Sequence, residues 1–139
     1  EAIAKSLVED TIGCFPSKDI TIMCGDWNTR IANLAPKLDD IHTSRISNDK
    51  ITNPRAPWLM EICEQQGWTI LNGLQPGPPA CDTFRRGEDS SCIDFIMTNK
   101  PNCRIEYDPT TLMGLSDHVF IKTQIAIPYL TSRRNIPIQ

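Results

Sequence analysis

Residues 20–28 have the sequence ITIMCGDWN, a short apolar and β-branched run that ends in GDWN. Such a run predicts a buried strand over residues 20–24, and Gly25 permits a tight exit from that strand. In an extended segment Asp26 and Asn28 point to the same side, so a carboxylate and an amide would meet at one spot. The pair could deprotonate a water and bind a phosphoryl oxygen, or it could be a turn built from two good turn formers.

Two helices and a long loop are expected around this strand. Apolar residues at helical spacing predict a helix over residues 2–15. Pro57 opens a second helical pattern that continues to about Gln66, and Gly67 ends it. The polar residues 29–56 predict a long loop, and a loop of this length in a compact domain is usually functional or mobile.

Further strands are predicted at residues 68–71, 82–86, 91–98 and 119–127. The turn residues 87–90 indicate that the second and third of these strands form a hairpin. Helices and strands in this order predict an α/β fold whose sheet carries helices on one face, which leaves the other face in need of cover. The tail, residues 128–139, contains two prolines and is expected to be loose.

The composition narrows the class of protein. Apolar residues make up 40% and charged residues 22% of the 139 residues, as in an ordinary globular domain. The net charge of −3 argues against a general nucleic-acid coat, but an enzyme that binds a divalent metal through carboxylates can carry such a charge. No segment approaches the ~18 consecutive apolar residues of a membrane span. The first residues do not form a signal peptide, which predicts an intracellular protein.

The six cysteines have neither C-x-x-C spacing nor a secretory context. We therefore interpret them as reduced thiols, mostly buried. A structural zinc site or a disulfide framework is the less favoured alternative.

Two later segments contain candidate catalytic side chains. His118 follows Asp117 at the start of the last predicted strand, where it could donate a hydrogen bond or a proton to a phosphate. Taken alone, His118 is more often a hydrogen-bonded surface residue. Asp94 lies between Ile93 and Phe95 in an apolar strand, and an unpaired charge there would be costly. We therefore expect Asp94 to pair with His118, unless Asp94 faces solvent on an edge strand.

Arg85 and Arg86 are adjacent in the predicted strand of residues 82–86. They are candidate substrate-binding residues, because arginines bind nucleic-acid phosphates. Such a pair is more often a solvated face of a strand.

Taken in order, these segments resemble the second half of the endonuclease/exonuclease/phosphatase superfamily, which has the DNase I-like fold. GDWN at residues 25–28 matches the family pattern G-D-[FLW]-N. The sequence SCIDFI at residues 91–96 matches S-x-I-D-[YF]-[IF], and SDH at residues 116–118 matches S-D-H. One departure is Phe120, where the family usually has proline.

The region between these motifs is similar to the endonucleases of non-LTR retrotransposons in particular. The similarity rests on the helix after the loop, the strand at residues 68–72 and the pair Thr83-Phe84. It covers residues 1–127, almost the whole sequence. The resemblance implies about half of a four-layer α/β sandwich, with one mainly antiparallel sheet and flanking helices.

The resemblance also implies an activity, Mg²⁺- or Mn²⁺-dependent hydrolysis of a phosphodiester in DNA. By this comparison Asp26 activates the attacking water, and Asn28 helps to hold the water and the phosphate. His118 stabilises the phosphate in the transition state and is oriented by Asp94. Asp117 would lie near the metal.

The family's first half supplies an asparagine and a metal-binding glutamate that have no counterpart here. We therefore expect the isolated chain to be inactive unless that half is supplied, and we expect the missing half or a second copy of the chain to cover the exposed sheet face. A retrotransposon endonuclease would act in the nucleus. Two alternatives remain: a non-catalytic remnant of such a domain, and a phosphomonoesterase branch of the family.

Overall fold

The computed structural model describes residues 20–39, 43–100, 103–108 and 115–125, together with Ser6 and Asp10. In this part of the chain the fold is mixed α/β, with mostly antiparallel strands and one named helix. Ser6 and Asp10 are helical, but the rest of the predicted helix over residues 2–15 lies outside the described residues. The predicted tail, residues 128–139, lies outside them as well.

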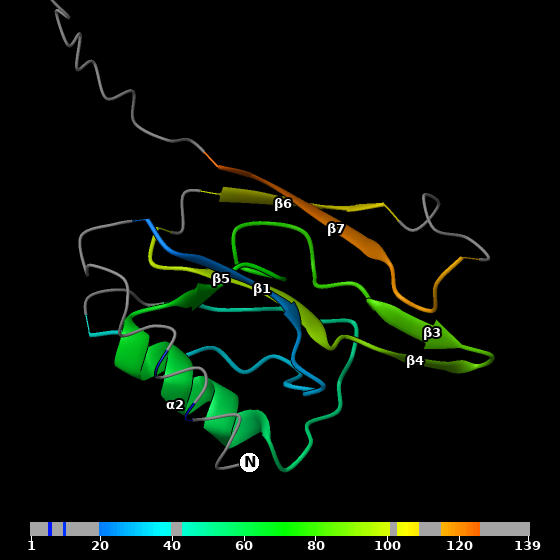
Figure 1. The fold of residues 1–139 in the computed structure, drawn as a ribbon, viewed down its shortest axis with the longest axis horizontal. Coiled ribbons are helices and arrows are strands. Elements are labelled where there is room, and N and C mark those ends of the chain that lie inside the picture. The colour runs from blue at the N-terminus through cyan, green and yellow to red at the C-terminus, as the bar shows by residue number, and fades with distance from the viewer. Residues whose placement is uncertain are drawn as a thin grey trace, which may run out of the picture.

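Strand β5, Asp94–Thr98, is the centre of the fold. It lies between β1 (Ile22–Asp26) and β2 (Thr69–Ile70) in a three-stranded antiparallel sheet of order β1-β5-β2. Its side chains alternate between the two faces of the sheet. One face packs on the helix (Figure 1). Because Phe95 and Met97 lie on that face, the alternation puts Asp94 on the other.

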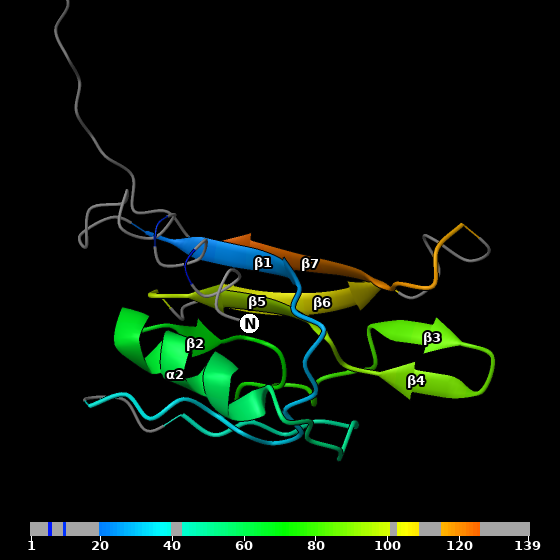
Figure 2. The same ribbon diagram turned by 60° about the horizontal axis from the view of Figure 1, so that its bottom comes forward.

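Helix α2, Ala56–Gln66, covers the first of these faces (Figure 2). Pro57 lies in its first turn, where a missing N–H does no harm. The helix ends at Gly67, whose φ of 67° is left-handed, and the N–H of Trp68 donates to the carbonyl of Cys63 at 2.8 Å. The predicted helix from Pro57 to Gln66 is confirmed. None of the helical segments in the described residues is long and apolar enough to cross a bilayer.

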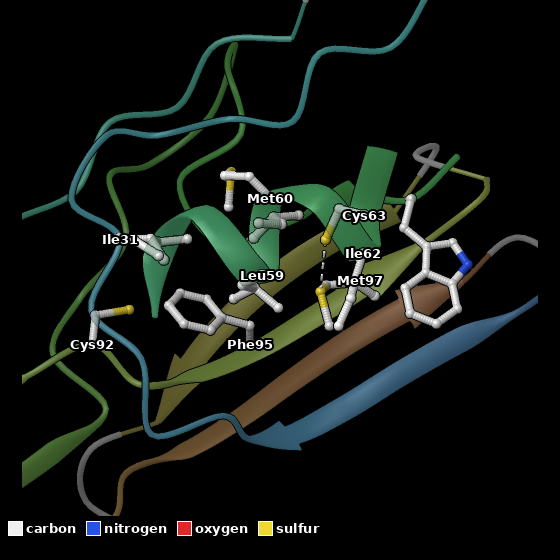
Figure 3. Close-up of a cluster of buried hydrophobic side chains, with 12 residues drawn as sticks. Ile31, Leu59, Met60, Ile62, Cys63, Cys92, Phe95 and Met97 are labelled. Carbon is white, nitrogen blue, oxygen red and sulfur yellow. Dashed lines mark hydrogen bonds between the residues drawn. The ribbon is translucent and has the colours of Figure 1, made fainter. Parts of the chain in front are cut away.

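The core lies between α2 and the sheet (Figure 3). Phe95, Met97 and Leu59 are each 0% exposed, and burial of such a side chain contributes about 1.5–3 kcal/mol. The thiol of Cys63 also contacts the sulfur of Met97 at 3.3 Å. The same cluster includes the following buried residues: Ile31, Ala56, Met60, Ile62, Trp68, Ile70, Ala80 and Cys92.

The prediction of a strand near residues 20–24 is correct, but the prediction that it is buried is wrong. β1 is an edge strand of the three-stranded sheet, and only its partly buried residue Met23 packs against the core. Ile22 is 39% exposed and Cys24 is also exposed, because α2 covers the opposite face of the strand. The β5 residue on the same face, Ile96, is 5% exposed, so the exposure on this face is concentrated on β1.

The predicted hairpin needs correction. β3 (Phe84–Arg86) pairs with β4 (Asp89–Ser91) across a turn at residues 87–88, so the hairpin is present but its second strand is residues 89–91 and not residues 91–98. Residues 92–93 belong to no strand, and β5, which begins at Asp94, then pairs within the central sheet. The β3–β4 hairpin lies at the end of the sheet where β1 ends and β5 begins (Figure 1).

A second hairpin contains a strand that the sequence analysis missed. β6 (Cys103–Asp108) pairs with β7 (Phe120–Ile125) on the β1 side of the sheet (Figures 1 and 2). The alternation predicted for the last strand is present, since Lys122 is exposed and Ile121 is half-buried. Lys122 lies opposite Glu106 and forms an ion pair with it at 3.0 Å. The described strands therefore form three small sheets, whereas a single sheet was expected.

The predicted long loop, residues 29–56, contains no named strand in its described part but is held tightly. Arg30 donates two hydrogen bonds to Asp49, at 2.7 and 2.8 Å, and this carboxylate is 1% exposed. The backbone N–H groups of Ile51 and Cys92 also donate to Asp49, each at 3.0 Å. Asp49 therefore fastens the loop to the segment just before β5.

Burial alone would raise the pKa of Asp49, but the Arg30 guanidinium and the N–H donors of Cys92 and Ile51 outweigh burial and lower it. The pKa of Arg30 is raised by its hydrogen bonds to Asp49. The ionised form of Asp49 thus stabilises the folded chain at pH values above the ordinary carboxyl pKa of 3.8. That contribution is lost as the pH falls through the lowered pKa.

The described cysteines divide into two kinds. Cys63 and Cys92 are buried, as predicted, and burial raises the pKa of each thiol to about 12. Cys24 is exposed and Cys81 is half-buried, which the prediction did not distinguish. The two buried thiols are neutral at physiological pH and act as small apolar residues.

We predict that Asp49→Asn lowers the free energy of unfolding by roughly 3 kcal/mol at pH 7, because four hydrogen bonds to a buried carboxylate are weakened. The deficit should shrink as the pH falls from the ordinary carboxyl pKa of 3.8 through the lowered pKa of Asp49, because the parent then protonates Asp49 and loses the same contribution. Urea unfolding across this pH range measures it, with the exposed Asp39→Asn as control. A deficit that stays constant with pH would contradict this assignment.

Candidate active site

The candidate site is built on two carboxylates that face each other across the β1–β5 pair. Asp26 is the last residue of β1 and Asp94 is the first residue of β5, and the antiparallel register places them directly opposite each other. Two like charges in such a cross-strand pair repel and destabilise a sheet. The repulsion is reduced if a cationic or hydrogen-bond-donating group lies beside both.

His118 provides that group. Its Nδ1 lies 3.0 and 3.1 Å from the two carboxylate oxygens of Asp94. An ionised carboxylate only accepts hydrogen bonds, so Nδ1 must carry the proton and donate. The other ring nitrogen, Nε2, lies 3.9 Å from Oδ2 of Asp26. The expected pairing of Asp94 with His118 is confirmed, and the structure adds Asp26 as the third member.

The three side chains differ in exposure. Asp94 is 17% exposed, His118 36% and Asp26 47%. The more buried carboxylate therefore binds Nδ1 of the histidine, and the more exposed carboxylate lies near Nε2.

The loop after β1 holds Asp26 by its backbone. Gly25 has a φ of 152°, which favours glycine, and the N–H of Trp27 donates to the carbonyl of Ile93 at 2.9 Å. Asn28 has a φ of 47°, so the segment is not extended there. Its backbone N–H, at 2.7 Å, donates to Oδ1 of Asp26 in an Asx-type turn. The turn interpretation of GDWN therefore describes the backbone, and the Asn28 side chain is exposed.

Asn72 binds the backbone of β5 at Asp94, the residue that carries the other carboxylate. It is 0% exposed, and its side chain donates to the carbonyl of Asp94 at 3.1 Å. Its carbonyl oxygen accepts the N–H of Ile96 at 3.0 Å. Asn72 thus continues the ladder beyond the short strand β2 and fixes the backbone from which Asp94 projects. The sequence analysis included Asn72 only in a strand, and its buried amide was the signal that it missed.

β3 holds the segment that contains His118. Arg85 N–H donates to the carbonyl of Asp117 at 2.8 Å, and Phe84 forms an isolated bridge with His118. The rings of Phe84 and His118 meet edge to face, with centroids 5.2 Å apart. Phe84 therefore restricts the rotation of the imidazole, a role that the sequence did not reveal.

Asp117 points to a different partner. Its Oδ2 accepts two hydrogen bonds from Arg86, at 3.0 and 2.7 Å, and the Arg86 guanidinium lies 5.6 Å from the centre of the Phe84 ring. The carboxylate of Asp117 is thus engaged on the β3 side and does not belong to the group formed by Asp26, Asp94 and His118. Arg85, the other predicted substrate-binding residue, is exposed on β3.

Asp26, Asp94 and His118 each offer one ligand atom within 4.8 Å of the others. Carboxylate oxygens suit Mg²⁺ or Mn²⁺, whereas an imidazole ligand is more typical of zinc, copper, iron or nickel. Because Asp94 is already occupied by His118, Asp26 is the carboxylate best placed to bind a hard cation. A single carboxylate fits Mg²⁺ only with water completing its shell.

The gap between His118 and Asp26 has chemical consequences. A separation of 3.9 Å is too long for a direct hydrogen bond. It is short enough that one oxygen atom can lie within about 3 Å of both Nε2 and Oδ2. The group can therefore hold an oxygen between a carboxylate that accepts a proton and an imidazole whose opposite nitrogen is already fixed.

No family model, curated protein or solved structure matches this chain. The chemistry of the site must therefore be judged from its own geometry.

We predict that Asp26→Asn stabilises the folded chain by about 0.5 kcal/mol, since it removes the repulsion with Asp94 while keeping the acceptor for the Asn28 N–H. Urea unfolding in low salt measures the gain, and 0.5 M NaCl should diminish it by screening the parent's repulsion. Asp39→Asn, an exposed carboxylate elsewhere, is the matched control. A loss of stability in Asp26→Asn would show that the carboxylate is part of a net attractive arrangement.

Proposed function

We propose that this chain contains the acid–base part of a Mg²⁺-dependent phosphodiesterase site that hydrolyses DNA, as in an endonuclease of the retrotransposon type. The observation that carries the proposal is the row Asp94–His118–Asp26, with a hydrogen bond at one end and a 3.9 Å gap at the other. A phosphodiester needs both a base for the attacking water and a donor toward its oxygens, and this row offers both.

The roles follow from the positions of the atoms. Asp94 accepts from Nδ1 of His118 and fixes the orientation and tautomer of the ring. Nε2 then faces the space beside Asp26, where in the protonated ring it can donate to a phosphate oxygen. Oδ2 of Asp26 accepts the proton of a water on the same side. The exposure of Asp26 lets substrate and water reach the group from solvent.

The metal would be held by Asp26, with water molecules completing its shell. When bound, Mg²⁺ would offset negative charge that develops on the phosphate. The carboxylate of Asp117 could contribute only after leaving Arg86, and an exposed ion pair of this kind is weak enough to exchange.

Substrate contacts are proposed for three residues near this group. Arg85 is exposed on β3 beside the segment of His118, where it could contact a phosphate. Arg86 would have to release Asp117 to do the same. The exposed side chain of Asn28, next to Asp26, is proposed to help hold the phosphate.

The larger architecture is part of the proposal. The exposed β1 residues Ile22 and Cys24 lie on the same face as Asp26 and are suited to contact with another protein surface. We propose that this surface belongs to the other half of a four-layer DNase I-like sandwich or to a second copy of the chain. Either partner would also bring further polar groups close to Asp26.

The experiment is nicking of supercoiled plasmid with 10 mM Mg²⁺, by the chain alone and with the N-terminal half of a DNase I-like endonuclease domain added. We expect nicking in at least one arm, reduced at least about 100-fold by Asp26→Asn and by His118→Gln, because each removes an acid–base group. Glu88→Gln, an equal loss of charge on the β3–β4 turn, should nick like the parent.

Two outcomes would overturn the proposal. One is the absence of nicking in both arms by protein that circular dichroism shows to be folded, which would favour a non-catalytic remnant. The other is nicking that Asp26→Asn and His118→Gln leave unchanged, which would point to a contaminating nuclease.

A further inference from the structure

Thr83 is hydrogen-bonded to the residues at the start of β5 and is not one of the three side chains of the candidate site. It is 0% exposed, although it precedes the half-exposed strand β3. Its hydroxyl oxygen accepts two consecutive backbone N–H groups, that of Ile93 at 3.1 Å and that of Asp94 at 3.0 Å. A hydroxyl oxygen has two lone pairs and can accept both N–H groups, and two donors in sequence fix the direction in which the chain enters β5.

The backbone of Thr83 makes the connection to the rest of the site. Its N–H donates to the carbonyl of Ser91 at 2.9 Å, and its carbonyl accepts the N–H of Val119 at 2.7 Å. Through these bonds one residue contacts both the segment of Asp94 and the segment of His118. The described interactions show no other residue that bonds to the backbone on either side of the Asp94–His118 pair in this way.

The separation of Asp94 and His118 therefore depends on Thr83. Residues 83–85 bind residues 117–119 through main-chain hydrogen bonds and a bridge. The Thr83 hydroxyl binds the N–H groups of residues 93–94, so both segments are fixed relative to Thr83. If the hydroxyl were absent, the buried N–H of Ile93 and the partly buried N–H of Asp94 would lose this acceptor. The start of β5 would then shift to find new partners, and Asp94 would move with it relative to the imidazole.

We propose that Thr83 is a positioning residue, whose hydroxyl sets the hydrogen bond between Asp94 and Nδ1 of His118. The proposal rests on the function proposed above only for its effect on rate. The geometric effect stands by itself, because the hydrogen bond of the imidazole can be observed without turnover.

The test compares Thr83→Val with Thr83→Ser and with Thr98→Val. Valine keeps the shape and removes the acceptor, whereas serine keeps the hydroxyl. Thr98 is a matched control: it is 0% exposed at the far end of β5, and its hydroxyl accepts the N–H of Lys100 at 3.1 Å. Long-range ¹H–¹⁵N spectra of the imidazole report the Nδ1–H signal, which is assigned with His118→Gln.

We expect Thr83→Val to lose or broaden the Nδ1–H signal and to lower nicking at least tenfold at saturating DNA, with a smaller change in the DNA concentration for half-maximal rate. Thr83→Ser and Thr98→Val should keep the signal and most of the rate. An unchanged signal in Thr83→Val, or an equal loss in Thr98→Val, would overturn the proposal.

Two further outcomes keep the test decisive. If Thr83→Val does not fold, loss of the signal in folded Thr83→Ser overturns the proposal, since serine retains the acceptor. If none of the proteins nicks DNA, the proposed function fails, while the Nδ1–H signal still decides the role of Thr83.

Discussion

Two carboxylates placed directly opposite each other across a pair of antiparallel strands dominate this structure. Asp26 and Asp94 would repel each other if no cationic or hydrogen-bond-donating group lay beside them. The imidazole of His118 relieves this repulsion by donating to Asp94 and by lying close to Asp26. The remainder of the described fold brings these three side chains, from distant parts of the sequence, to one end of the sheet.

The side chains of β5 alternate between a face that packs in the core and a face that contributes to the candidate site. Phe95 and Met97 point to α2 and are fully buried, whereas Asp94 points to the opposite face. The apolar face provides the free energy that holds the strand in place. That free energy lets the chain tolerate an unfavourable pair of charges at the strand's first residue, a common compromise at functional sites. Asn72 reinforces the backbone beneath that residue, where β2 is too short to continue the ladder.

Much of this arrangement was predictable from local sequence. α2 begins and ends as the positions of Pro57 and Gly67 predict, because the first turn tolerates proline and the left-handed end favours glycine. The pairing of Asp94 with His118 followed from the cost of leaving a charge among apolar neighbours. The exposure of Ile22 was not predictable, because it depends on β1 lying at the edge of the sheet.

Other errors have the same physical origin in long-range pairing. At residues 92–93, where β4 has ended, the backbone N–H groups donate to the side chains of Asp49 and Thr83, and no local pattern records these distant partners. Strand β6 is stabilised by β7, from which the sequence separates it by a stretch without a hairpin turn signal. The ion pair of Asp117 with Arg86 was not predictable either, because the two residues are 31 positions apart in the sequence.

The most direct measurement of the central claim is a double-mutant cycle between Asp94 and His118. The free energies of unfolding of the parent, Asp94→Asn, His118→Gln and the double variant are obtained from urea titrations at neutral pH. If the hydrogen bond at 3.0 Å holds the site together, the two side chains should be coupled favourably by about 1 kcal/mol. Effects that add within about 0.3 kcal/mol would contradict the account, because the imidazole would then not be held by Asp94.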